Sequence, residues 1–566
     1  MKRRTIVGGL QTRHVLACAG LAALLAGWSV PACAQYADIV LTNGKIVTVD
    51  DRFRIVQSLA VRGERIVAVG SNTEVARLKG PNTRTVDLTG HTVIPGLIDN
   101  HAHFMRAAEF WHREVRLDGV TSHKQALEML AKKARESQSG EWVVVLGGWS
   151  EEQFTDEPRG FTRRELDAIA AGHPVALQLF DSRVYANTAA LKALGIVAHT
   201  PDPANFKVER DAQGQPTGAL DGGPAIGALR ARLGEISRAK SVENVRALMH
   251  DLNVMGITAF QDQGGTGIKP AHLEAFRLVH DAGQMTVRSF YNHYEEPDTP
   301  AAVDTLLRRL GQIRPLRGDD WFGLTGYGET VYFPLHDTLL SKAAVPAPEA
   351  VEQWRRLALA LAQHGLHVNV HAQLHGSIEA FLGALEAVNK VRPIRGLRWT
   401  FSHLDQVNAE ELERMKRLNL YAQIHSRPTI QGGQMFRVHG DLTYHMPPLR
   451  LIQDSGLPWG LGSDATAAAP SNPFYTLWWA VSGDMIGGRK VNFETITREE
   501  ALVAHTRSNA AFLFEEGNLG SLAPGKYADL LVLDRDYLTV PVQDIKEIRP
   551  YKTMVGGKFV YDGMPD

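Results

Sequence analysis

Cysteine is almost absent from this chain of 566 residues. Its two cysteines, Cys18 and Cys33, both lie within the first 34 residues. The remainder of the sequence contains no thiol, which excludes disulfide bonds and thiolate metal ligands from it. Any metal ion bound there must be held by His, Asp or Glu side chains.

An excess of charge of either sign is also missing. The chain has 61 Lys and Arg residues against 62 Asp and Glu residues, and its formal net charge is -1. It has neither an acidic tail nor the basic stripe that binding to nucleic acid requires. Nucleic acid is therefore not an expected partner, and the question of a homo-oligomer stays open.

Long apolar runs are confined to the N-terminal segment. Residues 1–34 combine basic residues up to Arg13, an apolar run from Val15 to Val30 and the small residues Ala32-Cys33-Ala34. This order predicts a cleaved signal peptide over 1–34 and an exported protein, periplasmic or secreted. Arg3-Arg4 leaves the twin-arginine route open beside the general one. No second apolar stretch of about 18 residues follows, so no transmembrane span is expected in the mature chain.

Short strand and turn patterns occur at both ends of the mature sequence. Residues 39–42 and 45–48 flank Asn43-Gly44, which predicts a tight hairpin, and residues 59–69 repeat the pattern around Gly63. Near the C-terminus, residues 528–534 form a predicted strand, and a hairpin is predicted around Gly556-Gly557. We expect residues 35–93 and 515–566 to form one composite β-sandwich.

Between these ends, short apolar strands alternate with amphipathic helical stretches. That alternation is typical of βα units around a parallel sheet, and it predicts a TIM-like (β/α)8 barrel over residues 94–514. The interval from about 105 to 173 exceeds one βα unit and predicts an insertion. The eight predicted strands are 92–104, 174–181, 256–263, 322–329, 366–373, 397–405, 420–427 and 458–466. Predicted helices include 348–364, 378–391, 408–418 and 497–514.

Metal-ligand side chains follow several of these strands. His101 and His103 are two residues apart on an extended strand, so both can face one metal ion. In a (β/α)8 barrel the site lies at the C-terminal ends of the strands, where further candidate ligands occur. The candidate set is His101, His103, Glu329, His371, His403 and Asp464. Four imidazoles and two carboxylates suffice for two divalent metal ions with an open solvent position, which indicates metal-assisted hydrolysis.

The motif from Pro95 to His103, PGLIDNHAH, resembles the amidohydrolase superfamily. Within it, the chain is similar to the amidohydrolase 3 group, which includes YtcJ-like proteins and N-substituted formamide deformylases. The segment from Gly517 to Asp529 is similar to the family segment that re-enters the β-sandwich. The resemblance extends from about Ala37 to the C-terminus.

The resemblance implies a role for each ligand. His101, His103 and Asp464 would bind one metal, and His371 and His403 the other. Many relatives bridge the metals with a carboxylated lysine, but this chain has no lysine between Leu316 and Tyr332. Glu329 is therefore the candidate bridge, and a single metal is expected if it does not bridge. Zn²⁺ suits these ligands, as do Mn²⁺, Fe²⁺ and Co²⁺.

In the implied mechanism, hydroxide formed from water at the metal attacks a polarised carbonyl carbon. Asp464 accepts the proton of that water and passes it to the leaving nitrogen. Candidate substrate contacts are Arg183, His375, Gln423, His425 and Arg427. Arg183 could bind a substrate carboxylate or pair with Asp181. Gln423, His425 and Arg427, which alternate along one predicted strand, could instead fill polar positions at the barrel mouth.

The sequence thus favours an exported, metal-dependent amidohydrolase that hydrolyses a non-peptide carbon–nitrogen bond of a small molecule. A lyase or isomerase on the same scaffold would keep these ligands and use no attacking water. An inactive binding protein is the third alternative.

Overall fold

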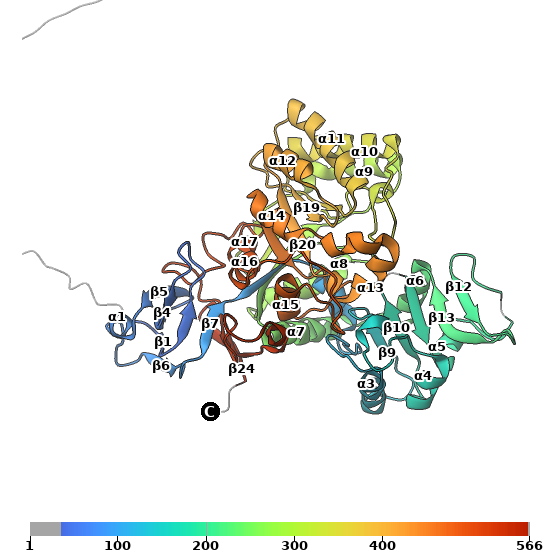
Figure 1. The fold of residues 1–566 in the computed structure, drawn as a ribbon, viewed down its shortest axis with the longest axis horizontal. Coiled ribbons are helices and arrows are strands. Elements are labelled where there is room, and N and C mark those ends of the chain that lie inside the picture. The colour runs from blue at the N-terminus through green and yellow to red at the C-terminus, as the bar shows by residue number, and fades with distance from the viewer. Residues whose placement is uncertain (1–35, 181, 200, 564–566) are drawn as a thin grey trace, which may run out of the picture.

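The computed structural model describes residues 36–563, apart from positions 181 and 200. The predicted signal peptide and both cysteines lie outside the described residues. Within the described part, no helix has both the length and the apolar composition needed to cross a membrane. The fold is mixed α/β, with a central group of parallel strands and further sheets on either side of it (Figure 1).

The central parallel strands belong to two sheets. In spatial order, the first contains β17 (Phe322–Tyr327), β15 (Arg288–His293), β14 (Ile257–Asp262) and β8 (Leu97–Ala102), with the short antiparallel β16 (Arg317–Gly318) at its edge. The second contains β18 (Asn369–Ala372), β19 (Thr400–His403), β20 (Tyr421–His425) and β21 (Trp459–Gly462). Isolated parallel bridges join Tyr327 to Val368 and Ala102 to Ala465, so the two sheets meet at both of their free edges.

One predicted central strand is wrong. Residues 174–181 do form a strand, β10 (Val175–Leu179), but it pairs with β9 (Val143–Leu146) and β11 (Arg183–Ala186) in a separate sheet. The position between β14 and β17 is taken by β15. Both strands are largely buried, but β10 is apolar apart from Gln178, whereas β15 begins with Arg288 and contains Ser289 and Asn292. The stronger hydrophobic signal therefore came from the strand outside the central group.

The separate sheet continues beyond residue 173. It orders β12 (Lys207–Arg210), β13 (Pro216–Asp221), β11, β10 and β9. The helices of this region are α3 (His123–Glu136), α4 (Arg163–Ile169), α5 (Thr188–Ala193) and α6 (Gly223–Arg232). Figure 1 shows this region on one side of the central strands, opposite the sheets of the chain ends.

Strands from both ends of the described chain share one sheet. Its order is β24 (Lys558–Asp562), β23 (Pro550–Val555), β22 (Leu530–Leu533), β7 (Thr92–Pro95), β2 (Lys45–Val47) and β3 (Ile55–Val56). A second sheet orders β5 (Arg65–Gly70), β4 (Ser58–Arg62), β1 (Ile39–Thr42) and β6 (Arg84–Asp87). One buried cluster includes Leu41, Val93, Leu530 and Met554, so apolar side chains from both ends pack together.

The hairpin predictions hold at two of three turns. β4 pairs with β5 around Gly63, and β23 pairs with β24 around Gly556-Gly557. The hairpin predicted at Asn43-Gly44 is wrong, because β1 and β2 lie in different sheets. Asn43 has the positive φ of 59° that such a turn favours. Its side chain, however, donates to Asp87 of β6, the strand that pairs in parallel with β1.

Helices cover the central strands. The helices here are α2 (Phe104–Ala107), α7 (Arg238–Met255), α8 (Pro270–Asp281), α9 (Pro300–Arg309), α10 (Pro348–Gln363), α11 (His375–Val391), α12 (Ala409–Leu418), α13 (Pro428–His439), α14 (Leu449–Ser455) and α15 (Pro473–Ser482). Three of them, α10, α11 and α12, match the predicted segments 348–364, 378–391 and 408–418. The predicted helix 497–514 is two helices, α16 (Arg498–Ala504) and α17 (Arg507–Ala510). Its predicted capping box is present: Glu500 N donates to Thr497 Oγ1, and Thr497 N donates to the Glu500 carboxylate.

Arg288 fixes the central strands to the sheet of the chain ends. This fully buried guanidinium donates from Nε to Asp529 Oδ2 at 2.8 Å and from Nη1 to the carbonyl of Asp320 at 2.9 Å. The rings of Trp321 and Tyr527 lie 4.3 and 4.0 Å from its central carbon. Because Asp529 immediately precedes β22 and Arg288 begins β15, one ion pair joins the two parts of the fold.

Candidate metal centre

The six candidate ligands meet at the C-terminal ends of the central strands. Three of them lie within strands: His101 in β8, His371 in β18 and His403 at the end of β19. The other three lie one or two residues beyond a strand: His103 after β8, Glu329 after β17 and Asp464 after β21. All six side chains are buried, with at most 8% of any residue exposed. His403 and Asp464 have φ values of 79° and 65°. Left-handed backbone at non-glycine residues is costly, and such conformations cluster at functional sites.

One group of three consists of His101, His103 and Asp464. Asp464 Oδ1 lies 3.0 Å from His103 Nε2 and 3.8 Å from His101 Nε2. The backbone holds the two segments together, because Asp464 N donates to His101 O at 2.9 Å and His103 N donates to Ala465 O at 2.7 Å. The strand pattern thus brings both histidines to the same carboxylate, as their spacing predicted.

The second group consists of Glu329, His371 and His403. Glu329 Oε2 lies 3.4 Å from His371 Nδ1 and 3.2 Å from His403 Nε2. The same carboxylate also faces the first group, with Oε2 3.3 Å from His101 Nε2 and Oε1 3.5 Å from His103 Nε2. Glu329 is therefore placed between the two groups, where a bridging ligand would lie.

The second nitrogen of each of three imidazoles is occupied by a neighbour. His103 Nδ1 donates to Gly264 O at 2.9 Å, and His371 Nε2 donates to Asp337 O at 2.9 Å. His101 Nδ1 lies 3.2 Å from Ser402 Oγ. Such outer contacts fix the tautomer and ring orientation of metal-binding histidines.

The charges of the site are balanced between carboxylates and cations. Burial would raise the pKa of Glu329, but His101 and the contacts from His371 and His403 hold it well below its ordinary value. Burial would also raise the pKa of Asp464, which Arg427 holds well below its ordinary value. Burial lowers the pKa of His371, yet Asp337 and Glu329 outweigh this and raise it to about 9. Both carboxylates are therefore ionised at neutral pH.

The donor set fits divalent metal ions. Ligands about 2.0–2.2 Å from a tetrahedral zinc lie roughly 3.3–3.6 Å from one another, close to the contacts that Glu329 makes with the histidines. His101 Nε2 is buried and makes no hydrogen bond in the described structure. A buried imidazole nitrogen without a partner is costly, and a cation at this point would supply one.

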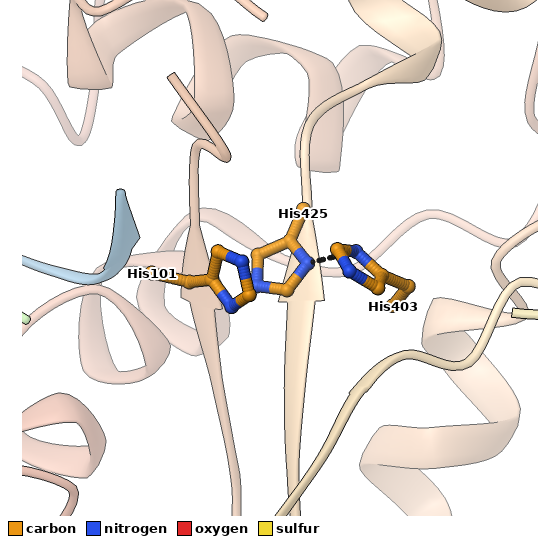
Figure 2. Close-up of side chains that lie close together, drawn as sticks. All are labelled: His101, His403 and His425. Atoms are coloured by element: carbon orange, nitrogen blue, oxygen red, sulfur yellow. Dashed lines mark hydrogen bonds between the residues drawn. The ribbon is translucent and has the colours of Figure 1, made fainter. Parts of the chain in front are cut away.

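His425 lies against two of the candidate ligands. Its ring centroid is 4.1 Å from that of His101 and 4.5 Å from that of His403, and its Nδ1 is 2.7 Å from His403 Nδ1 (Figure 2). His425 Nε2 is buried without a hydrogen bond. The three rings also form a possible metal-ligand group by distance. His425 is thus buried against His101 and His403, and it is not among the residues that line the cavity at the site.

The other predicted substrate contacts lie in different surroundings. Arg427 pairs with Asp464 Oδ2 at the site itself. Gln423 is fully buried below it, where it contacts Asn369 and donates to Asn100 O. His375 begins α11 and pairs with Glu411 at 2.7 Å. Arg183 lies in β11 of the separate sheet and pairs with Asp221 at 2.5 Å.

A cavity of about 950 Å³ opens onto the candidate ligands. His103, Glu329, His371 and Asp464 form part of its wall, and α6 of the separate sheet region forms another part. Its volume lies within the range of small-molecule sites. The helix α6, which lies beyond the predicted insertion of residues 105–173, thus helps to enclose the site.

Several residues of the site had no sequence signal that we recognised. Asp337 contacts His371 from an irregular loop, and Ser402 contacts His101 from a position beside His403. Arg106 lines the cavity three residues after His103, so its proximity to the predicted ligand was the one available indication.

Comparison with known proteins gives a consistent result. Residues 84–561 match the amidohydrolase family. The chain is 28% identical over 545 residues to the N-substituted formamide deformylase of Arthrobacter pascens, covering 93% of this chain and 99% of that protein. It is 25% identical over 494 residues to YtcJ of Bacillus subtilis (strain 168), covering 85% and 91% of the two chains.

A solved structure shares the fold. A metal-dependent hydrolase from Pyrococcus horikoshii OT3 superposes with a TM-score of 0.63 at 20% sequence identity. The match covers 89% of this chain and 99% of that one.

Proposed function

The chain belongs to the amidohydrolase family, and we propose that it hydrolyses a non-peptide carbon–nitrogen bond of a small molecule, most simply an amide. The observation that carries this proposal is the position of Glu329 between two groups of buried ligands. The similarity to an N-substituted formamide deformylase supports an amide as the substrate.

The proposal includes a finer description of the fold. The two central sheets, bridged at both edges, would act as one (β/α)8 barrel within residues 94–514. The insertion would begin near residue 105 and, because its sheet runs to Asp221, end beyond residue 173. Residues 35–93 and 515–566 would form the composite β-sandwich, supported by the pairing of β7 with β22.

His101, His103 and Asp464 would hold one divalent ion, and His371 and His403 the other, with Glu329 between them. Zn²⁺ is the ion we propose, since imidazole and carboxylate ligands suit it. When bound, such ions lower the pKa of water and polarise a carbonyl oxygen.

The side chains around the ions have separate tasks in this proposal. Asp464 accepts a proton from the attacking water and delivers it to the leaving nitrogen, since its carboxylate is ionised and borders the cavity. Arg427 orients Asp464 by donating to Oδ2, which leaves Oδ1 facing His103. The walls of the cavity, including α6, exclude bulk water and position the substrate.

Hydrolysis in isotopically labelled water tests the proposal. We expect the zinc-loaded protein to cleave N-substituted formamides and to place ¹⁸O from H₂¹⁸O in the formate. A chelator should abolish the reaction, and added Zn²⁺ should restore it, because the bound ion lowers the pKa of the attacking water. Turnover without label in the carboxylate would indicate a lyase or isomerase. Absence of metal-dependent cleavage across formamides and acetamides would contradict the proposal.

We further propose that residues 1–34 direct export to the periplasm or the medium and are then removed. The basic start, apolar run and Ala-Cys-Ala site support this. A protein recovered from its host cells with residues 1–34 intact would contradict it.

A further inference from the structure

Charged side chains in the wall of the cavity are mostly matched to partners. Lys269 pairs with Glu109 at 2.8 Å, and Arg427 pairs with Asp464. Arg230 donates to Gln178 and makes further contacts in its surroundings. Arg106 differs, because no carboxylate lies within 4.0 Å of its guanidinium among the described residues. Its hydrogen bond goes to the carbonyl of Thr266.

Arg106 is held close to a candidate metal ligand. It lies in α2, which begins directly after His103, and both side chains pack against the loop 264–267. A Cβ atom at Gly265 would lie 3.0 Å from His103 Nδ1 and 3.4 Å from Arg106 Nη1. Glycine at this position, with φ of 93°, thus leaves room for the two side chains to lie side by side at the cavity.

The buried carboxyl of Asp262, which contacts the start of α2 and the loop 264–267, is already engaged. Asp262, at the end of β14, accepts from the backbone of Met105 at 2.7 Å and from that of Gly264 at 2.8 Å. These contacts shape the loop and α2, and no ion pair joins Asp262 to Arg106. The guanidinium therefore keeps donor groups for a ligand in the cavity, in a planar arrangement that matches a carboxylate.

We infer that Arg106 binds an anionic group of the substrate, so that the natural substrate is an amide with a carboxylate near the bond that is cleaved. This inference rests on the proposed function. It moves the carboxylate-binding role considered for Arg183 to a different residue, since Arg183 is paired with Asp221 and does not line the cavity. Arg106 and His103 lie beside one loop, which places the anionic group a short distance from the reacting carbonyl.

The test compares acids with their uncharged isosteres. N-Formylglycine and N-formyl-β-alanine are each measured against the corresponding primary carboxamide with the zinc-loaded protein. A charge-assisted hydrogen bond should give the acid a kcat/KM roughly 10- to 100-fold above that of its carboxamide. In Arg106→Gln this ratio should fall close to one, mainly through a higher KM for the acid.

Arg183→Gln is the matched control, because it removes the same guanidinium from outside the cavity, and it should keep the wild-type ratio. Equal kcat/KM for acid and carboxamide in the wild type would overturn the inference about Arg106, and so would an unchanged acid-to-carboxamide ratio in Arg106→Gln. Either result would leave the proposed function standing. Loss of the ratio in Arg183→Gln with its retention in Arg106→Gln would assign the role to Arg183. If the zinc-loaded protein cleaves no amide of any charge, the proposed function fails and the inference with it.

Discussion

Asp464→Asn should lower kcat by roughly 10³-fold while leaving the fold intact. Asparagine has nearly the shape of aspartate, but its amide cannot accept the proton of the attacking water. It also removes the negative charge that faces His103 and pairs with Arg427. The measurement is kcat for a cleaved N-substituted formamide, together with the thermal unfolding midpoint and the zinc content of the variant.

The zinc content distinguishes two reasons for a loss of activity. A variant that retains its metal ions but not its turnover has lost the proton acceptor, whereas one that has also lost an ion has lost a ligand. Asp544→Asn, a change at an exposed carboxylate near the C-terminus, is the matched control and should retain wild-type kcat. Turnover in Asp464→Asn within a few-fold of wild type would contradict the role assigned to Asp464.

Arg288→Met should lower the free energy of unfolding by about 3–5 kcal/mol. Methionine fills part of the space between Trp321 and Tyr527 but leaves the carboxylate of Asp529 buried without its cation. Leaving one member of a buried ion pair uncompensated is among the costliest single changes in a protein interior. Equilibrium denaturation of the metal-loaded protein measures this loss.

An exposed ion pair provides the comparison. Arg355 pairs with Glu352 one turn apart on the surface of α10, and Arg355→Met should cost no more than about 0.5 kcal/mol. Replacing both members of the buried pair, as Arg288→Met with Asp529→Leu, should recover part of the loss because no unpaired charge remains. A loss below about 1 kcal/mol in Arg288→Met alone would show that this contact does not hold the two parts together.

The sequence identified side chains that the structure brings together, but it assigned one strand wrongly to the central group. His101 and His103 are close in sequence, and their alternation on a strand determines that both face the same side. Asp464 closely follows β21, and His371 and His403 lie within β18 and β19, close to the predicted strands. Local pattern was therefore sufficient to identify residues that the structure brings together, including Glu329.

Tertiary pairing accounts for what the sequence did not predict. β10 and β15 are both buried strands, and only their partners show which belongs to the central group. Asn43-Gly44 is a favourable hairpin turn, but the pairing of β1 with β6 sends the chain into another sheet. Asp337 reaches His371 from a loop, and Arg183 pairs with Asp221 across 38 residues of sequence. No local pattern specifies such contacts.

The most direct test of the whole account is the number of metal ions per chain. Elemental mass spectrometry of the zinc-loaded wild type should give two ions per chain, and Glu329→Gln should retain at most one, because the shared carboxylate is lost. Glu352→Gln, a change at an exposed glutamate, should retain two. One ion in the wild type, with the same count in Glu329→Gln, would contradict the bridged pair, and no bound ion would contradict the metal-dependent mechanism itself.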